Sequence, residues 1–94
     1  MQFAIYCLDK SGHGQLRADN RAAHLEYLKK FSAHVISAGP LLDDAGSAMI
    51  GSLLLMEFPD RAAVERFAAE DPYAKAGLFA SVRITPWRKV LPQG

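Results

Sequence analysis

Apolar residues recur at every second position, or in short unbroken runs, along three segments of the chain, and this is typical of β-strands. Residues 2–9 and residues 51–58 are apolar on both faces, so each is predicted to be a central strand of a sheet. Residues 82–90 form a third predicted strand. Because Pro86 lacks a backbone N–H, that strand belongs at a sheet edge or at a bulge.

Two further segments repeat apolar residues at the spacing of a helix. The first helix is expected to begin at a cap formed by Asp19 or Asn20, after a glycine-containing loop, and to run to about Ile36. The second is expected to run from a cap at Asp60 to about Glu70. Each helix therefore follows a predicted strand and precedes another.

Glycine and proline interrupt the chain between the first helix and the second central strand. Gly39 and Pro40 are expected to break the chain, and Leu41-Leu42 can pair as a short strand before a turn at residues 43–46. The resulting βαββαβ order predicts a ferredoxin-like α+β fold, with an antiparallel sheet and two helices on one of its faces.

The second central strand is apolar on the face that two helices cannot cover. Leu53 and Leu55 point to one side of the strand, whereas Leu54, Met56 and Phe58 point to the other. Monomeric proteins rarely expose a large apolar patch. We therefore expect a homodimer joined through the sheet faces.

Composition and charge exclude several classes of function. The chain has 94 residues, of which 50% are hydrophobic, and this fits a single domain over residues 1–94. Its formal net charge of +1 comes from interspersed charges of both signs, so we expect no nucleic-acid partner and no membrane partner. The N-terminal residues do not resemble a signal peptide, and a cytoplasmic protein is expected.

Neither a disulfide nor a metal site is expected. Cys7 is the single cysteine and is predicted to fill space in the core. His13 lies between glycines in a loop that could act as a lid, and His34 is expected to be a solvated helix residue. The histidines lack the spacing of metal ligands, and no glycine loop of the phosphate-binding type precedes a helix. We therefore predict no metal and no cofactor.

Two polar residues fall on the predicted buried faces of the two helices. His24 is spaced to share a helical face with Leu28, Phe31 and Val35, and Asp71 follows the second helix in line with its apolar residues. Imidazole suits general acid–base catalysis, and a carboxylate beside it fixes its tautomer and balances its charge. His24 and Asp71 are therefore candidate catalytic residues. Two other interpretations stay open: His24 as a core or helix-start residue, and Asp71 as the N-cap of the short turn that follows it.

Several short motifs occur in the order found in one known family. They are Arg21-Ala22-Ala23-His24, Ala38-Gly39-Pro40-Leu41-Leu42, Gly51-Ser52, Asp71-Pro72-Tyr73, Ala76-Gly77-Leu78 and Pro86-Trp87-Arg88-Lys89-Val90. Together they cover nearly the whole chain, which resembles the YciI-like (YCII-related) family. The resemblance implies a single YciI-like domain with a dimeric α+β barrel fold, and an active-site histidine–aspartate pair that falls on His24 and Asp71. Ala22 stands where many members carry proline, a difference that affects helix capping more than chemistry.

Five further residues are candidate substrate contacts: Arg21, Gly39, Pro40, Ser52 and Tyr73. Arg21 could bind an anionic group with a forked hydrogen bond, or be a solvated helix-start arginine. The hydroxyl of Ser52 could meet a ligand, or simply start a strand. Tyr73 could bound a pocket or pack against the sheet, and the Gly39-Pro40 backbone could line the pocket or only turn the chain.

The resemblance implies a wide range of reactions, from elimination of halide from chlorinated hydroquinones to the lactone isomerases and oxygenases that share the barrel. Our principal hypothesis is a small cofactor-independent enzyme, lyase-like or isomerase-like, in which His24 and Asp71 move a proton on a small-molecule ligand. The alternative is a non-catalytic dimeric ligand-binding or accessory domain. In a third, purely structural interpretation, neither residue contacts a ligand. The residues of the chain do not choose a substrate.

Overall fold

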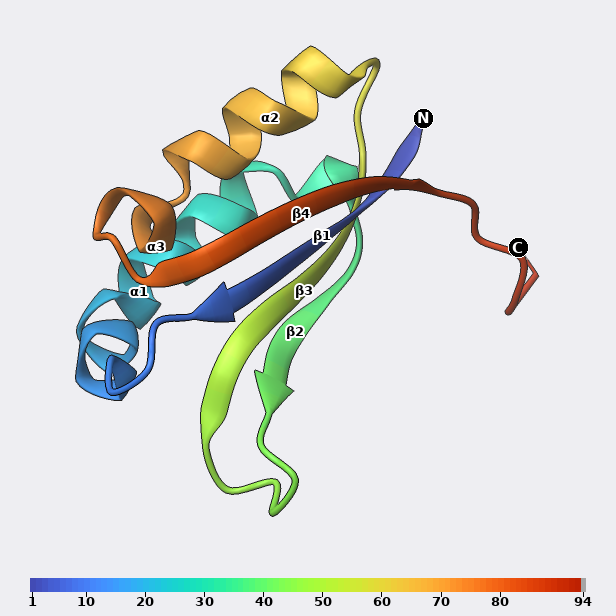
Figure 1. Cartoon of the computed structure of the whole chain (residues 1–94). Helices are drawn as coiled ribbons and strands as arrows, with labels where there is room; N and C mark the ends of the chain where they lie inside the picture. Colours follow the sequence, from blue (N-terminus) through green and yellow to red (C-terminus); the bar gives the residue numbers. More distant parts are fainter. Residues whose placement is uncertain (94) are drawn as a thin grey trace.

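The computed structural model describes residues 1–93, which form a sheet layer and a helix layer (Figure 1). In chain order the elements are β1 (Gln2–Asp9), α1 (Gly14–Lys30), a short 3₁₀ helix η1 (Ser32–His34), β2 (Val35–Leu42), β3 (Met49–Glu57), α2 (Arg61–Glu70), α3 (Pro72–Lys75) and β4 (Phe79–Trp87). No helix in this part of the chain is both long enough and apolar enough to cross a bilayer.

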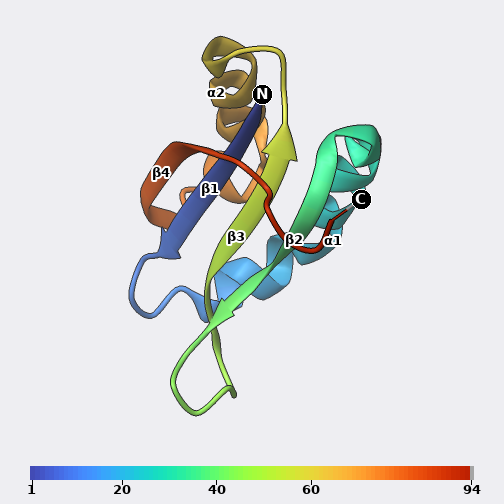
Figure 2. The same ribbon diagram turned by 90° about the vertical axis from the view of Figure 1, so that its right-hand side faces the viewer.

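The strands of residues 1–93 form one antiparallel sheet in the order β2-β3-β1-β4 (Figure 2). The two strands that are apolar on both faces, β1 and β3, occupy its centre, as the sequence predicts. β4 lies at an edge, where the missing N–H of Pro86 is tolerated. The element order and the sheet order together confirm the ferredoxin-like α+β fold.

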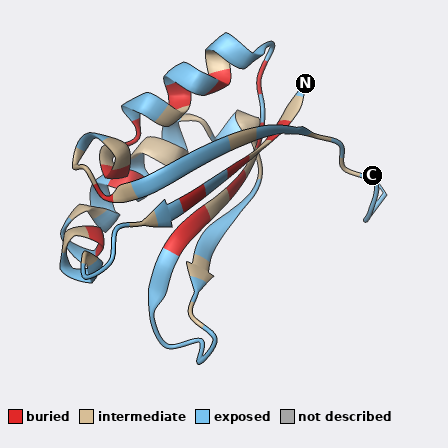
Figure 3. Ribbon diagram, in the orientation of Figure 1, coloured by how far each residue is buried: buried red, intermediate tan, exposed pale blue. Residues whose placement is uncertain are grey.

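The core lies between the helix layer and one face of the sheet (Figure 3). Ile5 pairs with Leu54 across β1 and β3, and Phe3 pairs with Met56, and all four side chains are almost completely buried. Phe67 of α2 packs into the same cluster. Burial of one such side chain contributes about 1.5–3 kcal/mol, so this layer fixes the position of the helices on the sheet.

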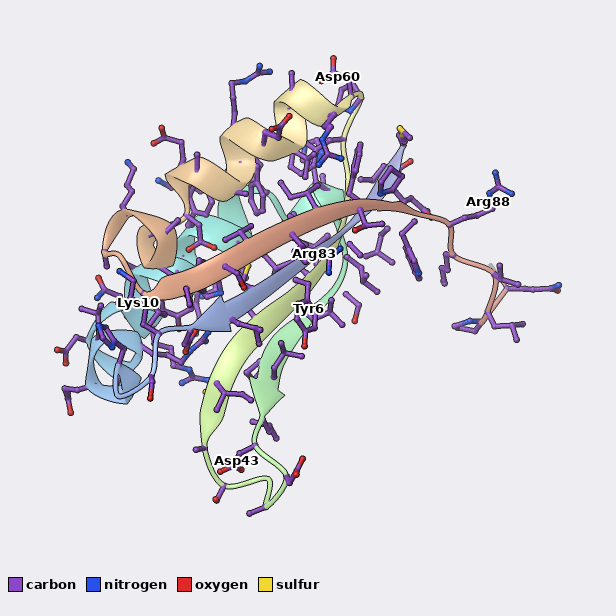
Figure 4. The ribbon with its side chains drawn as sticks, in the orientation of Figure 1. Tyr6, Lys10, Asp43, Asp60, Arg83 and Arg88 are labelled. Atoms are coloured by element: carbon purple, nitrogen blue, oxygen red, sulfur yellow. The ribbon has the colours of Figure 1, made fainter. Side chains whose placement is uncertain are left out.

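The opposite face of the sheet carries several apolar side chains and is not covered by a helix of the described chain. Tyr6 is 41% exposed, Leu8 is also exposed, and Leu53 and Leu55 are partly exposed. Tyr6 and Arg83 are cross-strand partners on this face (Figure 4). We call this surface the open sheet face.

The predicted first helix is wrong at both ends. α1 begins at Gly14 and ends at Lys30, instead of running from Asp19 or Asn20 to Ile36. Asp19 and Asn20 lie inside the helix, where their side chains make hydrogen bonds one turn earlier in the chain. The true start has no side-chain cap hydrogen bond, so the preference for capping residues indicated the wrong positions.

The predicted break at Gly39 and Pro40 is also wrong. Both residues lie inside β2, which runs from Val35 to Leu42 and pairs with β3. β2 is an edge strand, so it tolerates a proline that a central strand would not. β3 and β4 each begin and end earlier than the hydrophobic pattern indicates.

Two local predictions are confirmed. Asp60 caps α2, because its carboxylate accepts a hydrogen bond from the backbone N–H of Ala63 at 2.8 Å (Figure 4). The turn after β2 lies where it is expected, with Gly46 at a φ of 73°, a conformation that favours glycine. The Asp43 carboxylate accepts a hydrogen bond from the backbone N–H of Ser47 across this turn.

Candidate active site

His24 and Asp71 lie in direct contact, although 47 residues separate them in the sequence. The Nδ1 atom of His24, on α1, lies 2.9 Å from Oδ1 and 3.1 Å from Oδ2 of Asp71, which lies between α2 and α3. The two residues are only 6% and 3% exposed. A carboxylate only accepts hydrogen bonds, so Nδ1 of His24 carries a hydrogen and Nε2 presents a lone pair when the ring is neutral.

Asp71 has a second role in the backbone. Its Oδ1 atom accepts a hydrogen bond from the backbone N–H of Tyr73 at 2.9 Å, and Pro72 occupies the first turn of α3. Asp71 therefore is the N-cap that the sequence offered as an alternative. The same side chain contacts His24, so the cap and the histidine share one carboxylate.

Tyr73 stacks on His24, with ring centroids 4.0 Å apart and planes inclined by 17°. The guanidinium carbon of Arg17 lies 4.5 Å from the centroid of the same tyrosine ring. Burial raises the pKa of the Tyr73 phenol, and the positive charge of Arg17 partly opposes this shift. The tyrosine thus holds the imidazole plane on one side of the site.

Arg17 is a site residue that the sequence analysis missed. It is 5% exposed, and its Nε and Nη2 atoms donate a forked pair of hydrogen bonds to the Asp9 carboxylate at 2.7 and 2.9 Å. Nη2 also donates to the hydroxyl of Ser52 at 2.9 Å. Burial lowers the pKa of Arg17, but the hydrogen bonds and charge of Asp9 outweigh burial, so the net shift is upward and the group stays charged.

The signal for Arg17 was present in the sequence but depended on the start of the helix. The helix α1 begins at Gly14. With that start, one helical face carries four residues at spacings of four, three and four, namely Arg17, Arg21, His24 and Leu28. Because the helix was predicted to begin at Asp19 or Asn20, Arg17 was assigned to the loop before it and so was left off that face.

These side chains surround a pocket of about 140 Å³ between α1 and the sheet. It is lined by Arg17, Arg21, His24, Leu25, Leu28, Ala38, Gly39, Pro40, Met49, Ser52, Leu54 and Tyr73. All of the predicted substrate contacts are among them. Asp71 is not, because it lies behind His24. An adjoining hollow of about 440 Å³ shares Arg17, Arg21 and Met49, which marks the direction in which the pocket continues toward the surface.

The pocket lining contains two guanidinium groups and no carboxylate. The described residues provide no hydrogen-bond partner for His24 Nε2, and this atom is not fully buried. Cys7 is buried beside the site as the cross-strand partner of Ser52, and burial raises the pKa of its thiol to about 12. A thiol in that state is a poor nucleophile, so the arrangement favours proton transfer over covalent catalysis.

The other two histidines lie outside the pocket. His34, expected to be a solvated helix residue, lies in the short 3₁₀ helix η1 and is half-buried rather than fully solvated. Its Nδ1 atom lies 2.7 Å from the carbonyl oxygen of Glu57, and its ring stacks on Phe58. The Nδ1 atom of His13 lies 2.7 Å from the carbonyl oxygen of Ser11, just before α1. Residues 1–93 contain no group of three or more histidine, cysteine or acidic side chains that could bind a metal ion.

The sequence profile of the YCII-related domain matches residues 1–88. The chain belongs to the YCII-related family. Protein YciI of Escherichia coli O6:H1 is 33% identical over 97 aligned positions, covering 96% of this chain and 99% of its own. An uncharacterized protein of Haemophilus influenzae is 32% identical with the same coverage.

One solved structure of the same family has a named reaction. It is 5-chloro-2-hydroxyhydroquinone dehydrochlorinase (TftG) from Burkholderia phenoliruptrix AC1100, in complex with 2,5-dihydroxybenzoquinone. The two structures superpose with a TM-score of 0.90 at 40% sequence identity, over 94% of each chain. A protein with this fold and substantial sequence identity therefore acts on a small molecule with a single ring.

Proposed function

We propose that this YCII-related protein is a small-molecule enzyme of the lyase type, in which His24 moves a proton and Asp71 holds His24 in place. The observation that carries the proposal is the contact of His24 Nδ1 with a buried carboxylate while the same imidazole lines the pocket. A fixed Nδ1–H tautomer leaves Nε2 as the one basic nitrogen that a bound molecule can meet.

The size of the pocket supports a ligand with one ring. Drug-sized ligands occupy pockets of about 300–1,000 Å³, whereas a cavity of about 150 Å³ accommodates benzene. The pocket of this protein, at about 140 Å³, is in the second range. Its walls combine apolar side chains such as Leu28 and Leu54 with a few polar groups, which suits a hydroxylated ring. TftG, which is 40% identical, binds a molecule of this kind.

Elimination of hydrogen halide from a halogenated hydroquinone needs only proton transfers and a departing halide. One hydroxyl proton moves to the ring carbon that bears the halogen, a second hydroxyl loses its proton to solvent, and the halide leaves with the electron pair of the carbon–halogen bond. The ring becomes a quinone, and the electrons balance without an external oxidant. In this proposal, Nε2 of His24 is the group that accepts and returns the proton.

We also propose that the protein works as a cytoplasmic homodimer joined through the open sheet face. This proposal is supported by the exposure of Tyr6 and Leu8 and the partial exposure of Leu53 and Leu55 on that face. Burial of such side chains against a second copy would remove apolar surface from water.

The test uses a pair of histidine variants. His24→Gln removes the pocket base. His34→Gln is the matched control, since its Nδ1 atom also contacts an oxygen, here a backbone carbonyl, and its ring also stacks on an aromatic ring, but it lies outside the pocket. A panel of halogenated and hydroxylated single-ring compounds is incubated with each protein, and halide release and quinone absorbance are measured. We expect turnover in the wild type and in His34→Gln, and a loss of about 10²–10⁴-fold in His24→Gln.

Two outcomes would contradict the proposal. Full turnover by a folded His24→Gln protein would mean that another group moves the proton. Tight binding of a panel compound that stays chemically unchanged after long incubation would favour the alternative, a ligand-binding domain without catalysis.

A further inference from the structure

Arg17 is a buried arginine whose side chain is fixed by several hydrogen bonds. Its side chain reaches from α1 to the sheet, where Asp9 at the end of β1 and Ser52 near the start of β3 accept its hydrogen bonds. These three hydrogen bonds come from Nε and Nη2, and the guanidinium also interacts with Tyr73, whose ring lies beneath it. Nη1 takes part in none of these three hydrogen bonds, so it has donor capacity for a ligand on a side chain that lines the pocket.

Ser52 supplies a second donor at the same place. Its hydroxyl oxygen accepts from Arg17 Nη2, so its own hydrogen is not used in that hydrogen bond. Ser52 is 2% exposed and lines the pocket beside Arg17. Among the described residues, Arg17 satisfies the Ser52 oxygen as an acceptor, and no hydrogen bond donated by the hydroxyl is found. A buried donor without an acceptor costs free energy, and an acceptor on a ligand would remove that cost.

The charges near the pocket are arranged by depth. Arg17 and Arg21 line the pocket, whereas the carboxylates that balance positive charge here, Asp9 and Asp71, do not. A ligand therefore meets guanidinium groups first and carboxylates only behind them. Because β1 and β3 fix Arg17 before a ligand arrives, little further ordering is needed on binding.

We propose that the pocket binds its substrate as an anion, with an ionised ring oxygen on Arg17 Nη1 and the Ser52 hydroxyl, and with Arg21 adding charge at the rim. This inference rests on the proposed function, since it assigns the substrate class of the same pocket. The oxygen bound by Arg17 is distinct from the hydroxyl that gives its proton to His24. A substrate ring thus needs two oxygen substituents, one ionised and one protonated.

The test compares two single-ring probes that differ in charge. 2,5-Dihydroxybenzoquinone is ionised at neutral pH, because its hydroxyls are vinylogous acids, and hydroquinone is neutral. Isothermal titration calorimetry at low ionic strength gives the Kd of each probe for the wild type and the variants. We expect the wild type to bind the anion at least about tenfold more tightly than hydroquinone.

Two variants of Arg17 separate binding from folding. In Arg17→Lys the charge is kept, but one ammonium group cannot bond to Asp9 and also reach the ligand as Nη1 does. In the double variant Asp9→Asn with Arg17→Gln, the pair becomes neutral and no buried carboxylate is left alone. Both are expected to weaken binding of the anion about tenfold or more and to leave the Kd for hydroquinone within about twofold. Arg66→Gln, an exposed arginine outside the pocket, is the control for net charge and should change neither Kd.

The outcomes distinguish this inference from the proposed function. It is overturned if the wild type shows no preference for the anion, if it binds neither probe, or if the Arg17 variants weaken both probes equally. His24→Gln should still bind the anion within a few-fold of the wild type while its turnover is lost. Retained turnover in His24→Gln contradicts the proposed function alone, and an unchanged anion preference in the Arg17 variants contradicts this inference alone.

Discussion

Replacement of Asp71 by alanine is expected to be far more costly than replacement of another helix cap. Asp71 accepts hydrogen bonds from two buried donors, the backbone N–H of Tyr73 and Nδ1 of His24. Each buried donor left without a partner costs about 1–3 kcal/mol. We therefore expect Asp71→Ala to lower the free energy of unfolding by about 3 kcal/mol, and the melting temperature by about 12–24 °C for a domain of this size.

Asp60 provides the matched control for this prediction. It caps α2 by accepting one hydrogen bond from the N–H of Ala63, in an exposed position, and it makes no hydrogen bond with a histidine among the described residues. Asp60→Ala should therefore cost about 1 kcal/mol, the usual value for loss of a cap. Asp71→Asn should cost less than Asp71→Ala, because the amide oxygen has two lone pairs and can accept from both donors.

The assay is urea unfolding followed by far-ultraviolet circular dichroism, at one fixed protein concentration because association would shift the transition. Nitrogen-15 NMR of the imidazole adds a second measurement, in which the wild type should show the Nδ1–H tautomer of His24. If Asp71→Ala costs no more than Asp60→Ala, the carboxylate serves only the backbone turn, and the argument that it holds His24 is refuted.

Three further predictions concern the core, a backbone contact and assembly. Burial raises the pKa of the Cys7 thiol from its ordinary 9.0 to about 12, so its contribution to stability is complete below pH 9 and is lost as the pH rises toward 12. The free energy of unfolding, measured across that pH range, should fall less steeply in Cys7→Ser than in the wild type. Rapid reaction of the native thiol with a disulfide reagent would contradict the burial. A Cβ atom at Gly51 would overlap the backbone carbonyl oxygen of Cys7, so Gly51→Ala should lose about 3 kcal/mol or fail to fold. Gly14→Ala, where nothing lies nearby, should cost under about 0.5 kcal/mol in the same unfolding assay, and equal losses would refute the steric argument. Light scattering should show a dimer that Leu53→Lys combined with Leu55→Lys converts to a monomer, and a monomeric wild type would end the dimer proposal.

The sequence predicted the fold class because the hydrophobic pattern of the central strands extends over their whole length. β1 and β3 are apolar on both faces, and such strands belong at the centre of a sheet. Helix ends were harder, because they depend on single residues. Asp19 and Asn20 have the chemistry of caps, but tertiary contacts of Arg17 with Asp9 and Ser52 extend α1 past them.

The candidate site was predicted in part, because two of its residues interrupt a periodic hydrophobic pattern. His24 and Asp71 each stood out on an apolar helical face, and the structure places them in contact. Tyr73 and Ser52 entered as weaker candidates, and the structure brings both to the pocket. Arg17 was missed because its segment was taken for a loop, which hid its position on the helical face of Arg21 and His24. Its pairing with Asp9 is a tertiary contact that the sequence does not reveal.

The double role of Asp71 affects how the history of a protein like this would be interpreted. Its carboxylate caps α3 even without His24, so a descendant that had lost the chemistry would still be selected to keep the aspartate for its fold. His24 caps nothing and meets the carboxylate only through its side chain. In such a lineage the histidine would be substituted first. A homologue that keeps the aspartate but lacks the histidine would therefore be one that kept the fold and lost the catalytic activity.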